Sequence, residues 1–412
     1  MTVIEFYDRV PLHNIASTLI YRPERVILVG DSNNTLLKKI EIYKEIAKKR
    51  GISVEFTHRS INKNKLDEII RSLAEIVETY DDCVFDVTGG SEVYLVAVGV
   101  MLERYKGRVQ CQRLRFKNST VMDCDGDGEM PEAESFDITI EETVEMSGGR
   151  VKSYSRIDRE AWTEEFDRDL VAIWSCCRKN PSYWNALISN FAAICRTHPG
   201  FGFEESEDQL YYSFTKKQID MMLQYNYGKN TFTYSALREL IDLGLLSRVV
   251  FLDRVTFAFK NRFVKRCLTT AGAILEWYIA KRVSEAKDKS GKFIYHDVAV
   301  GVTVDWDRID DDVFPTYNEI DVVAMRGAVP MFISCKNGIV SVEELYKLNT
   351  VADAFGKRYA KRVLVATELD KYGARAEAVK ARADDMDIRV IDNVDEMSDA
   401  ELNRLLSTLW SS

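Results

Sequence analysis

Short apolar runs and longer amphipathic stretches alternate along residues 1–118 of the chain. Five apolar runs predict β-strands, at Val3–Tyr7, Arg25–Gly30, Ser53–Phe56, Cys83–Val87 and Val109–Phe116. The stretches between them predict helices, at Leu12–Tyr21, Leu36–Lys49, Leu66–Tyr80 and Val93–Tyr105. Strands that alternate with helices in this way are joined by right-handed crossovers. We therefore expect a parallel, Rossmann-like α/β sheet.

Small and polar residues follow two strands of this predicted sheet, at the edge where such sheets bind ligands. The candidate ligand-binding residues are Asn14, Gly30, Asp31, Ser32, Asn33, Thr88, Gly89, Gly90 and Ser91. Backbone N–H groups at helix starts of this kind bind phosphate. Glycines also form ordinary turns, so each loop alone is open to both interpretations. Two such loops at one edge favour a ligand site, although neither has the glycine signature of a dinucleotide or ATP site.

An acidic segment follows, and two further strands are predicted in it at Phe136–Ile140 and Thr143–Met146, as a β-extension. The spacing of acidic residues from Asp123 to Glu134 fits an EF-hand calcium loop. Pro131 lies inside that loop, and no helix pair flanks it. An acidic hairpin loop is therefore the favoured interpretation.

The middle of the chain outlines a winged helix, with two helices followed by a β-hairpin. The predicted elements are Phe214–Leu223, Tyr234–Leu243, Arg248–Phe251 and Val255–Phe259. The second helix offers Arg238 for base contacts, next to Glu239 and Asp242. Because these acids oppose DNA binding, we expect a connector or dimerisation module rather than a DNA reader.

The C-terminal part predicts a helix, three strands, a helix, a strand, a helix and a last strand. These elements are Ala271–Ala280, Phe293–Val304, Glu319–Met325, Val329–Cys335, 343–348, Arg362–Ala366, Ala374–Asp384 and Arg389–Ile391. Asp321 and Lys336 lie in two neighbouring apolar strands. A carboxylate in such a strand is costly unless it has a partner or a metal. The pair could orient a water on a divalent cation for attack on a phosphodiester, or it could form a structural salt bridge.

Composition bounds the class of protein. At 412 residues the chain is too long for one ordinary core, so two or three domains are expected. The apolar fraction of 46% and the charged fraction of 29% are typical of a soluble globular protein. No apolar run approaches the roughly 20 residues that span a bilayer. Since no secretory signal is visible either, a cytoplasmic protein without a membrane partner is expected.

Cysteine usage and charge narrow the chemistry further. The eight cysteines form no CxxC pair, which favours reduced thiols over a zinc site or a disulfide frame. A formal net charge of −9 argues against non-specific coating of nucleic acid. Basic side chains nevertheless gather between Lys260 and Lys292. They form either a solvated helix face or a local nucleic-acid contact, and both interpretations are open.

The N-terminal loops carry a family resemblance. Thr88-Gly89-Gly90-Ser91, together with Gly30-Asp31-Ser32 and Asn14, resembles the CARF domain. That family senses the cyclic oligoadenylates made by type III CRISPR complexes. Glu92 departs from the pattern, because many CARF domains carry a phosphate-contacting lysine at this position.

The C-terminal segment resembles the PD-(D/E)xK nucleases that are fused to CARF domains. The matching runs are Leu275-Glu276-x-Tyr278, Asn318-Glu319-Ile320-Asp321, Ser334-Cys335-Lys336 and Leu345-Tyr346-Lys347-Leu348. The resemblance implies that Asp321, with the Cys335 carbonyl, holds Mg²⁺ or Mn²⁺, and that Lys336 lies near the attacking water. It also implies that Glu276 completes the site from its helix, as a ligand or through a water.

Ser334 departs from the pattern, because most relatives carry a glutamate there. A hydroxyl cannot replace that charge. Some restriction enzymes with a serine at this place recruit a carboxylate from the next helix, where this chain has Glu343 and Glu344. Glu319 is a further candidate, since it shares a face with Asp321 if the strand is regular.

Together the resemblances imply a sensor–nuclease in three segments: a CARF domain with an acidic β-extension (1–150), a helical and winged-helix-like connector (151–265) and a nuclease domain (266–412). The expected assembly is a homodimer that binds a cyclic oligoadenylate, expected to be cyclic tetra-adenylate, and then cuts DNA or RNA. A ligand-responsive transcription regulator with an inert C-terminal domain is one alternative. A constitutive repair or restriction nuclease is another.

Overall fold

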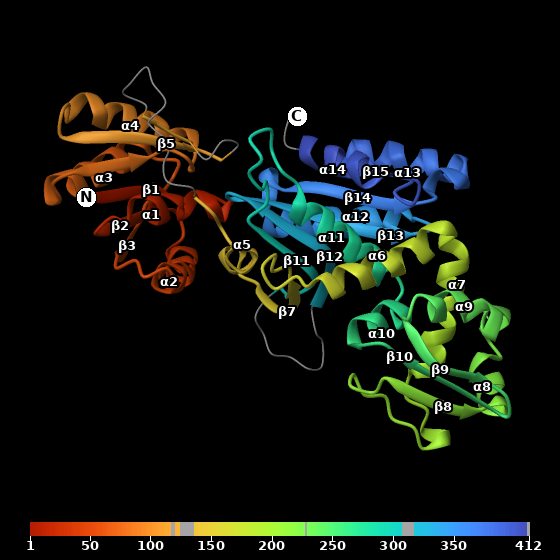
Figure 1. Cartoon of the computed structure of the whole chain (residues 1–412). Helices are drawn as coiled ribbons and strands as arrows, with labels where there is room; N and C mark the ends of the chain where they lie inside the picture. The colour runs from red at the N-terminus through yellow and green to blue at the C-terminus, as the bar shows by residue number, and fades with distance from the viewer. Residues whose placement is uncertain (117–119, 124–135, 227–228, 307–316, 410–412) are drawn as a thin grey trace.

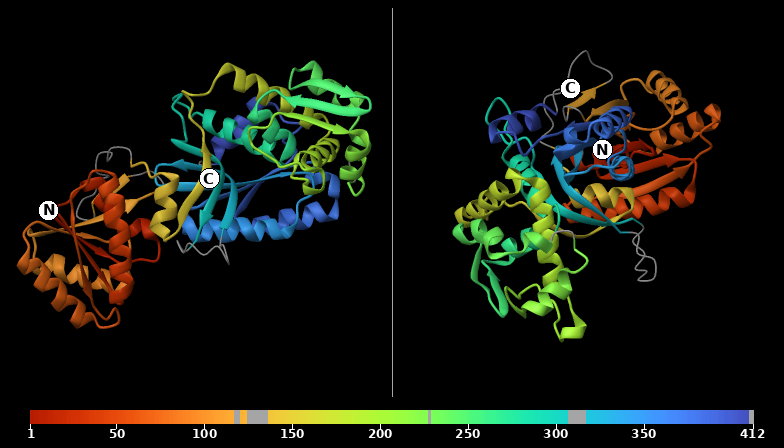
Figure 2. Two further views of the ribbon diagram at one scale, coloured as in Figure 1. Left: turned by 90° about the horizontal axis from the view of Figure 1, so that it is seen from below. Right: turned by 90° about the vertical axis from the view of Figure 1, so that its right-hand side faces the viewer.

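The computed structural model describes residues 1–116, 120–123, 136–226, 229–306 and 317–409. It contains a six-stranded N-terminal sheet, a six-stranded C-terminal sheet and a three-stranded sheet between them in sequence. In Figure 1 and in the left view of Figure 2, the C-terminal sheet lies in the middle of the molecule, with the other two on either side. Within the described part, no helix has the length and apolar character that a membrane crossing requires. The seven cysteines of this part are free thiols, as predicted.

The N-terminal sheet has the strand order β3-β2-β1-β4-β5-β6, and only β6 runs antiparallel to its neighbour. The strands are β1 (Thr2–Phe6), β2 (Arg25–Gly30), β3 (Glu55–Ser60), β4 (Cys83–Asp86), β5 (Val109–Arg115) and β6 (Thr120–Asp123). One face packs against η1 (Pro11–Asn14), α1 (Ala16–Tyr21) and α2 (Asn33–Lys49), and the other against α3 (Leu66–Thr79) and α4 (Glu92–Arg104). Both faces are covered, so every residue of β1 and β4 is buried, as is every residue of β2 except Arg25. The predicted parallel sheet is confirmed.

The strands predicted at Phe136–Ile140 and Thr143–Met146 are wrong, because residues Ile140–Ser147 form a helix, α5. Thr139 and Glu142 make a capping box that fixes its start. Short apolar runs do not separate strand from helix by periodicity alone, and here the capping residues decide. The predicted acidic loop beyond Asp123, as far as Glu134, lies outside the described residues.

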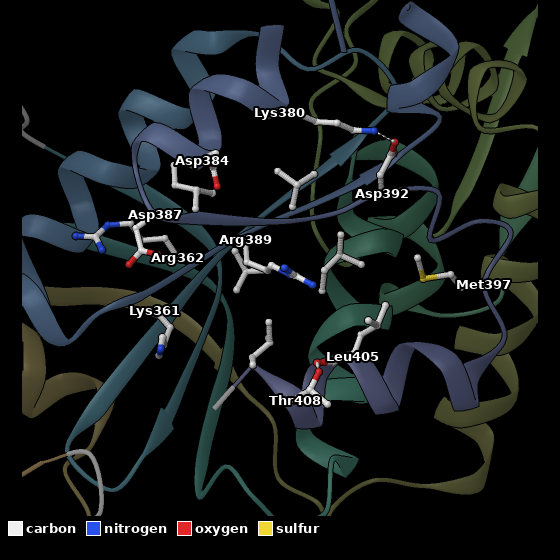
Figure 3. A pocket seen from close by; sticks show the side chains of 15 residues that line it. Lys361, Arg362, Lys380, Asp384, Asp387, Arg389, Asp392, Met397, Leu405 and Thr408 are labelled. Atoms are coloured by element: carbon white, nitrogen blue, oxygen red, sulfur yellow. Dashed lines mark hydrogen bonds and ion pairs between the residues drawn. The ribbon is translucent and has the colours of Figure 1, made fainter. Parts of the chain in front are cut away.

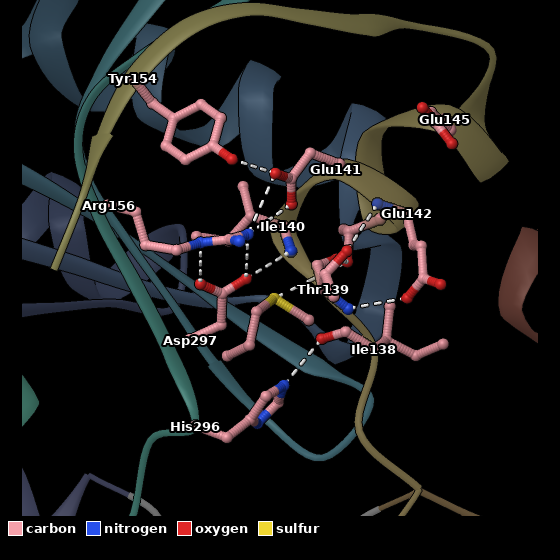
Figure 4. A network of polar contacts seen from close by, with 12 residues as sticks. Ile138, Thr139, Ile140, Glu141, Glu142, Glu145, Tyr154, Arg156, His296 and Asp297 are labelled. Carbon is pink, nitrogen blue, oxygen red and sulfur yellow. Dashed lines mark hydrogen bonds and ion pairs between the residues drawn. The ribbon is translucent and has the colours of Figure 1, made fainter. Parts of the chain in front are cut away.

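Helix α5 joins the two large sheets. On the N-terminal side, Arg50 at the end of α2 donates to Glu142 at 2.5 Å. On the C-terminal side, Arg156 pairs with Glu141 at 2.8 Å and with Asp297 at 3.0 Å (Figure 4). Asp297 also accepts a hydrogen bond from the first backbone N–H of α5 at 3.0 Å. The helix is therefore held by charge pairs on both sides.

The connector contains a winged-helix arrangement, as predicted. Its elements are α6 (Glu164–Lys179), α7 (Pro181–Cys195), η2 (Pro199–Phe201), β8 (Tyr211–Thr215), α8 (Lys216–Leu223), η3 (Lys229–Thr231), α9 (Tyr234–Asp242), β9 (Leu246–Phe251), β10 (Arg254–Phe259) and α10 (Arg262–Thr269). The antiparallel order β8-β10-β9 places the first strand beside the hairpin. Phe214, expected in a helix, lies in β8 because Thr215 caps α8.

The C-terminal sheet has the order β15-β14-β13-β12-β11-β7. Its elements are β7 (Arg150–Arg156), α11 (Ala273–Glu285), β11 (Asp297–Asp305), β12 (Tyr317–Arg326), β13 (Val329–Asn337), α12 (Val342–Phe355), η4 (Lys357–Tyr359), β14 (Lys361–Thr367), η5 (Leu369–Tyr372), α13 (Ala374–Asp385), β15 (Ile388–Ile391) and α14 (Asp399–Thr408). Helices α11 and α14 cover one face, and α12 and α13 the other. Strand β7 lies outside the predicted limits 266–412, yet it completes this sheet beside β11.

Candidate functional site

Asp321 receives several donors from the neighbouring strand. Strands β12 and β13 are antiparallel partners, and Val322 faces Ile333 in their register. Asp321 Oδ2 therefore lies beside the end of β13, where it accepts from the backbone N–H of Cys335 at 2.6 Å and from the hydroxyl of Ser334 at 3.2 Å. The predicted meeting of Asp321 with the Ser334-Cys335-Lys336 run is found in the structure.

Lys336 lies between two carboxylates. Its Nζ is 3.5 Å from Asp321 Oδ2 and 3.1 Å from Glu344 Oε2. Burial lowers the pKa of Lys336, but these two carboxylates outweigh it and hold the pKa above its ordinary value. The side chain is therefore a cation at neutral pH, fixed in place from both sides.

Glu344, in the first turn of α12, is the helix carboxylate that reaches the strand site. Burial raises its pKa, but Lys347 and Lys336 hold that pKa below the ordinary value. Glu343 points elsewhere and is exposed. Of the two residues predicted to replace the charge missing at Ser334, the structure places Glu344 at Lys336.

Glu276 enters from α11 on the opposite face of the sheet. Burial and the carboxylates of Asp321 and Glu319 raise the pKa of Glu276 to about 8, while Arg266 acts in the opposite direction. A β carbon at Gly301, which has φ +62°, would lie 3.3 Å from Arg266 Nη2 and 3.4 Å from Glu319 Oε1. Gly301 therefore leaves room for Arg266 beside the acids. Arg266 was noted in the sequence only within the basic stretch, and no local pattern separated it from its neighbours.

The basic stretch has acidic partners along much of its length. Lys260 pairs with Asp169, Lys281 with Asp167, and Arg282 with Asp399 at 2.8 Å. Both lysine pairs measure 2.6 Å. These pairs join α11 and Lys260, which lies just before α10, to neighbouring helices, so they favour the structural interpretation of this stretch.

The donor chemistry of the site fits a hard divalent cation, because carboxylate and carbonyl oxygens suit Mg²⁺ and Mn²⁺. A pocket of about 80 Å³ leads to these oxygens; its lining includes Asn318, Glu319, Asp321, Ser334, Lys336 and Glu344. Within the described residues, no three His, Cys, Asp or Glu side chains converge closely enough to hold a metal. A cation here would therefore rely on Asp321, a backbone carbonyl and water, with Glu276 or Glu344 nearby.

Thr88, Gly89 and Gly90 form a tightly packed loop after β4. The N–H of Thr88 donates to Asp86 Oδ1 at 2.7 Å, and its hydroxyl accepts from the backbone of β5 at 2.8 Å. A β carbon on Gly89 would lie 2.8 Å from Asp8 Cβ, and one on Gly90 would lie 2.6 Å from Phe6 Cβ. Both glycines are thus required by packing.

The other candidate ligand residues divide into buried and exposed groups. Asn14 is buried and accepts from the N–H of Asp8 at 2.7 Å, so its role is structural. Asp31, Ser32 and Asn33 are exposed beyond Gly30 at the carboxyl end of β2. The hydroxyl of Ser91 is buried and, among the described residues, has no hydrogen-bond partner. The exposed loop and the unpartnered hydroxyl could both accept a polar ligand.

A wider pocket of about 770 Å³ lies along the edge strand β15 (Figure 3). It is lined by residues that include Lys361, Lys380, Arg389 and Asp392. Lys380 there is 3.8 Å from Asp392. None of the predicted site residues lines this pocket, so chemistry rather than volume identifies the candidate site.

Comparison with known proteins identifies a family match for the C-terminal segment and a similar fold for the chain. Residues 263–407 match the family model described as the Card1-like endonuclease domain, whereas no curated protein sequence matches the chain. The solved structure of protein VC1899 from Vibrio cholerae is similar over 100% of this chain and 97% of its own, with a TM-score of 0.71 and 18% identity. Can2 from Sulfobacillus thermosulfidooxidans, in complex with cyclic tetra-adenylate, covers the same shares with a TM-score of 0.68 and 14% identity.

A type III CRISPR defence DNA nuclease activated by cyclic oligoadenylate is also similar, with a TM-score of 0.50 and 14% identity. The similarity covers 89% of this chain and 45% of that protein. The family match confirms the resemblance inferred for the C-terminal segment, and the structural matches confirm the fold.

Proposed function

We propose that this protein is a metal-dependent endonuclease that a cyclic oligoadenylate activates in type III CRISPR antiviral defence. The observation that carries the proposal is Lys336, held between Asp321 and Glu344 in a domain that matches Card1-like endonucleases. A lysine held between carboxylates is an arrangement that can support phosphodiester hydrolysis. The substrate is DNA, RNA or both.

Each residue of the site has a chemical role in this proposal. Lys336 stabilises the negative charge that builds on the scissile phosphate, because its ammonium is fixed and partly shielded from water. Asp321 orients Lys336 and supplies oxygen to Mg²⁺ or Mn²⁺, together with the Cys335 carbonyl. The cation, when bound, lowers the pKa of a water and polarises the phosphate. Glu276, whose pKa burial and the neighbouring carboxylates raise, completes the site from α11, as a ligand or through a bound water.

In this proposal, Ser334 and Glu344 together take the role of a single glutamate in related sites. The Ser334 hydroxyl donates to Asp321 and so holds that carboxylate in one orientation. The Glu344 carboxylate supplies the negative charge beside Lys336. The helix carboxylate thus replaces the charge that the serine lacks.

The N-terminal sheet is the sensor in this proposal. The ligand is a cyclic oligoadenylate, and cyclic tetra-adenylate is the expected ring, as in the Can2 complex. The exposed loop at Asp31, Ser32 and Asn33 and the free hydroxyl of Ser91 would contact it. Such a ring has two-fold symmetry, so a homodimer with one ring between two N-terminal domains follows. The proposed location is the cytoplasm.

The winged-helix order favours a second function, a ligand-responsive transcription regulator. The charges of its second helix oppose that function. Arg238 lies 3.8 Å from Asp242, and Glu239 pairs with Lys179 of α6. Because the arginine that could contact bases lies next to acids, α9 is poorly suited to bind a DNA major groove. The nuclease is therefore the preferred function.

The deciding experiment is a cleavage assay on labelled single-stranded RNA, single-stranded DNA and supercoiled plasmid. Each substrate is incubated with Mn²⁺ or EDTA, with and without cyclic tetra-adenylate. We expect wild-type cleavage to require Mn²⁺ and to be low without ligand, and we expect at least a roughly 100-fold loss in Lys336→Ala. Lys371→Ala is the matched control, because Lys371 also pairs with a glutamate, Glu368, but lies outside the site. Cleavage that persists in Lys336→Ala, or that saturating ligand does not raise, contradicts the proposal.

A further inference from the structure

The N-terminal domain touches the C-terminal domain at a second place besides α5, through a buried histidine. His13 lies in η1, directly after the first strand, and is 2% exposed. Its two ring nitrogens face different domains: Nδ1 faces Asp8 of the sensor domain, and Nε2 faces Tyr359 of the C-terminal domain. A buried imidazole that bridges two domains can transmit a change from one to the other.

On the sensor side, the histidine is tied to the glycine loop. Asp8 Oδ2 lies 3.5 Å from His13 Nδ1 and accepts the backbone N–H of Gly90 at 3.2 Å. Asp8 Oδ1 accepts from Val10 at 2.8 Å. Burial raises the pKa of Asp8, but its contacts with His13 and Val10 outweigh burial and hold that pKa below the ordinary value. Asp8 is thus an ionised carboxylate that connects the proposed ligand loop to the imidazole.

On the other side, the hydroxyl of Tyr359 lies 2.8 Å from His13 Nε2. Arg358 Nη2 donates to the same hydroxyl at 3.1 Å. When Nδ1 carries the proton, it faces Asp8 as an electrostatic contact without a hydrogen bond among the described residues, and Nε2 accepts from Tyr359. Phe116 packs on both rings, with centroids 5.6 Å from His13 and 5.2 Å from Tyr359. The contact is therefore directional and enclosed.

Tyr359 is joined by a short path to the catalytic side chains. It ends η4, which follows α12 after one residue, Gly356. A β carbon on Gly356 would lie 2.7 Å from Pro330 Cγ, so this turn is pressed against the start of β13. The other end of α12 carries Glu344, and the other end of β13 carries Lys336. A shift at Tyr359 thus reaches both members of the Lys336–Glu344 pair through two rigid elements.

We infer that His13 and Tyr359 are positioning residues that couple ligand binding at the Gly90 loop to the placement of Glu344 beside Lys336. This inference rests on the proposed function and deepens it by naming its route of regulation. A ligand phosphate bound by the loop competes with Asp8 for the Gly90 N–H and repels the Asp8 carboxylate. The hold of Asp8 on His13 then differs between the ligand-free and ligand-bound states, and activation requires such a difference.

The test compares Tyr359→Phe with wild type. This variant removes one hydroxyl and keeps the ring that packs on Phe116. Cleavage is measured in Mn²⁺ with and without cyclic tetra-adenylate, and the affinity for the ligand is measured by titration. We expect the ratio of activated to basal kcat/KM to fall by about tenfold, the size of one lost directional hydrogen bond, with basal activity kept. Tyr372→Phe, which removes a hydroxyl elsewhere in the same domain, is the matched control and keeps the full ratio.

A pair of substitutions at His13 separates coupling from folding. In His13→Gln the amide can still donate toward Asp8 and accept from Tyr359, so we expect most of the activation ratio to return. In His13→Leu, which can make neither contact, we expect the activation ratio to be lost. Equal ratios in wild type, Tyr359→Phe and His13→Leu overturn the inference, as does a Tyr359→Phe that loses basal and activated cleavage in the same proportion. A wild-type protein that the ligand does not activate overturns the proposed function itself, and the inference with it.

Discussion

Replacing Glu276 by glutamine should remove a pH dependence of stability. Burial, Asp321 and Glu319 raise the pKa of Glu276 from the ordinary 4.5 to about 8. The folded protein then binds a proton that the unfolded chain has already released above pH 4.5, so stability falls as pH rises toward 8. At about 1.4 kcal/mol for each pH unit, the full effect is about 5 kcal/mol, of which about 3 kcal/mol appears between pH 6 and pH 9.

The assay is urea unfolding at pH 6 and pH 9 in EDTA, for wild type and Glu276→Gln. Asp86, whose pKa burial raises to about 6, also titrates in part of this range. It lies in the other sheet, so its effect cancels in the difference between the two proteins. At each pH, the free energy of unfolding of wild type is subtracted from that of Glu276→Gln. The result should be about 3 kcal/mol larger at pH 9 than at pH 6. Glu103→Gln, an exposed change on α4, serves as the control. A difference near zero would refute the electrostatic account of the site.

Two further predictions concern the glycine loop and the joint between the sheets. Gly90→Ala should lower the free energy of unfolding by about 3 kcal/mol, because φ is +92° and the new β carbon would lie 2.6 Å from Phe6 Cβ. The control Gly99→Ala, in open space on α4, should be neutral or stabilising by up to about 1 kcal/mol. Equal urea midpoints for the two variants would contradict this prediction. Arg156→Ala should cost about 2 kcal/mol, since it leaves the buried Asp297 carboxylate with fewer partners. The exposed pair removed by Arg238→Ala should cost about 0.5 kcal/mol or less, and an equal loss in both variants would count against the reasoning.

Most of the fold could be predicted because its strands are buried on both faces. Such strands are continuous apolar runs, as in Arg25–Gly30, and their crossover helices are long enough to be recognised. Strand β7 was missed because its sequence is polar and its partner, β11, lies far away along the chain. Helix α5 was misassigned because two short apolar runs resemble strands, whereas the capping pair of Thr139 and Glu142 begins a helix between them. Local pattern thus fails where an element depends on distant partners or on caps.

The candidate site was partly predictable for the same reason. Side chains alternate along a strand with period two, so Ser334 and Lys336 could be assigned to one face of β13. Asp321 and Glu319 line one pocket, but so do Asn318 and Ile320 at the alternate positions, so the shared face of Glu319 and Asp321 stays a prediction. The choice between Glu343 and Glu344 needed the start angle of α12, which no sequence pattern gives. Arg266 needed the packing of α10 against the sheet, and its approach depends on the missing side chain at Gly301.

The position of the replacing carboxylate has a regulatory consequence. A glutamate at position 334 would be fixed by the ladder of β13 and would face Lys336 in every state of the protein. With Ser334 there, the charge comes from α12, whose other end leads to Tyr359 and so to His13. In the proposed coupling, placement of Glu344 depends on the contact between the two domains, and the Lys336–Glu344 pair can form or separate without any change in the sheet. The activation ratio of Tyr359→Phe measures this dependence directly, because the substitution alters the domain contact and leaves Asp321, Lys336 and Glu344 untouched.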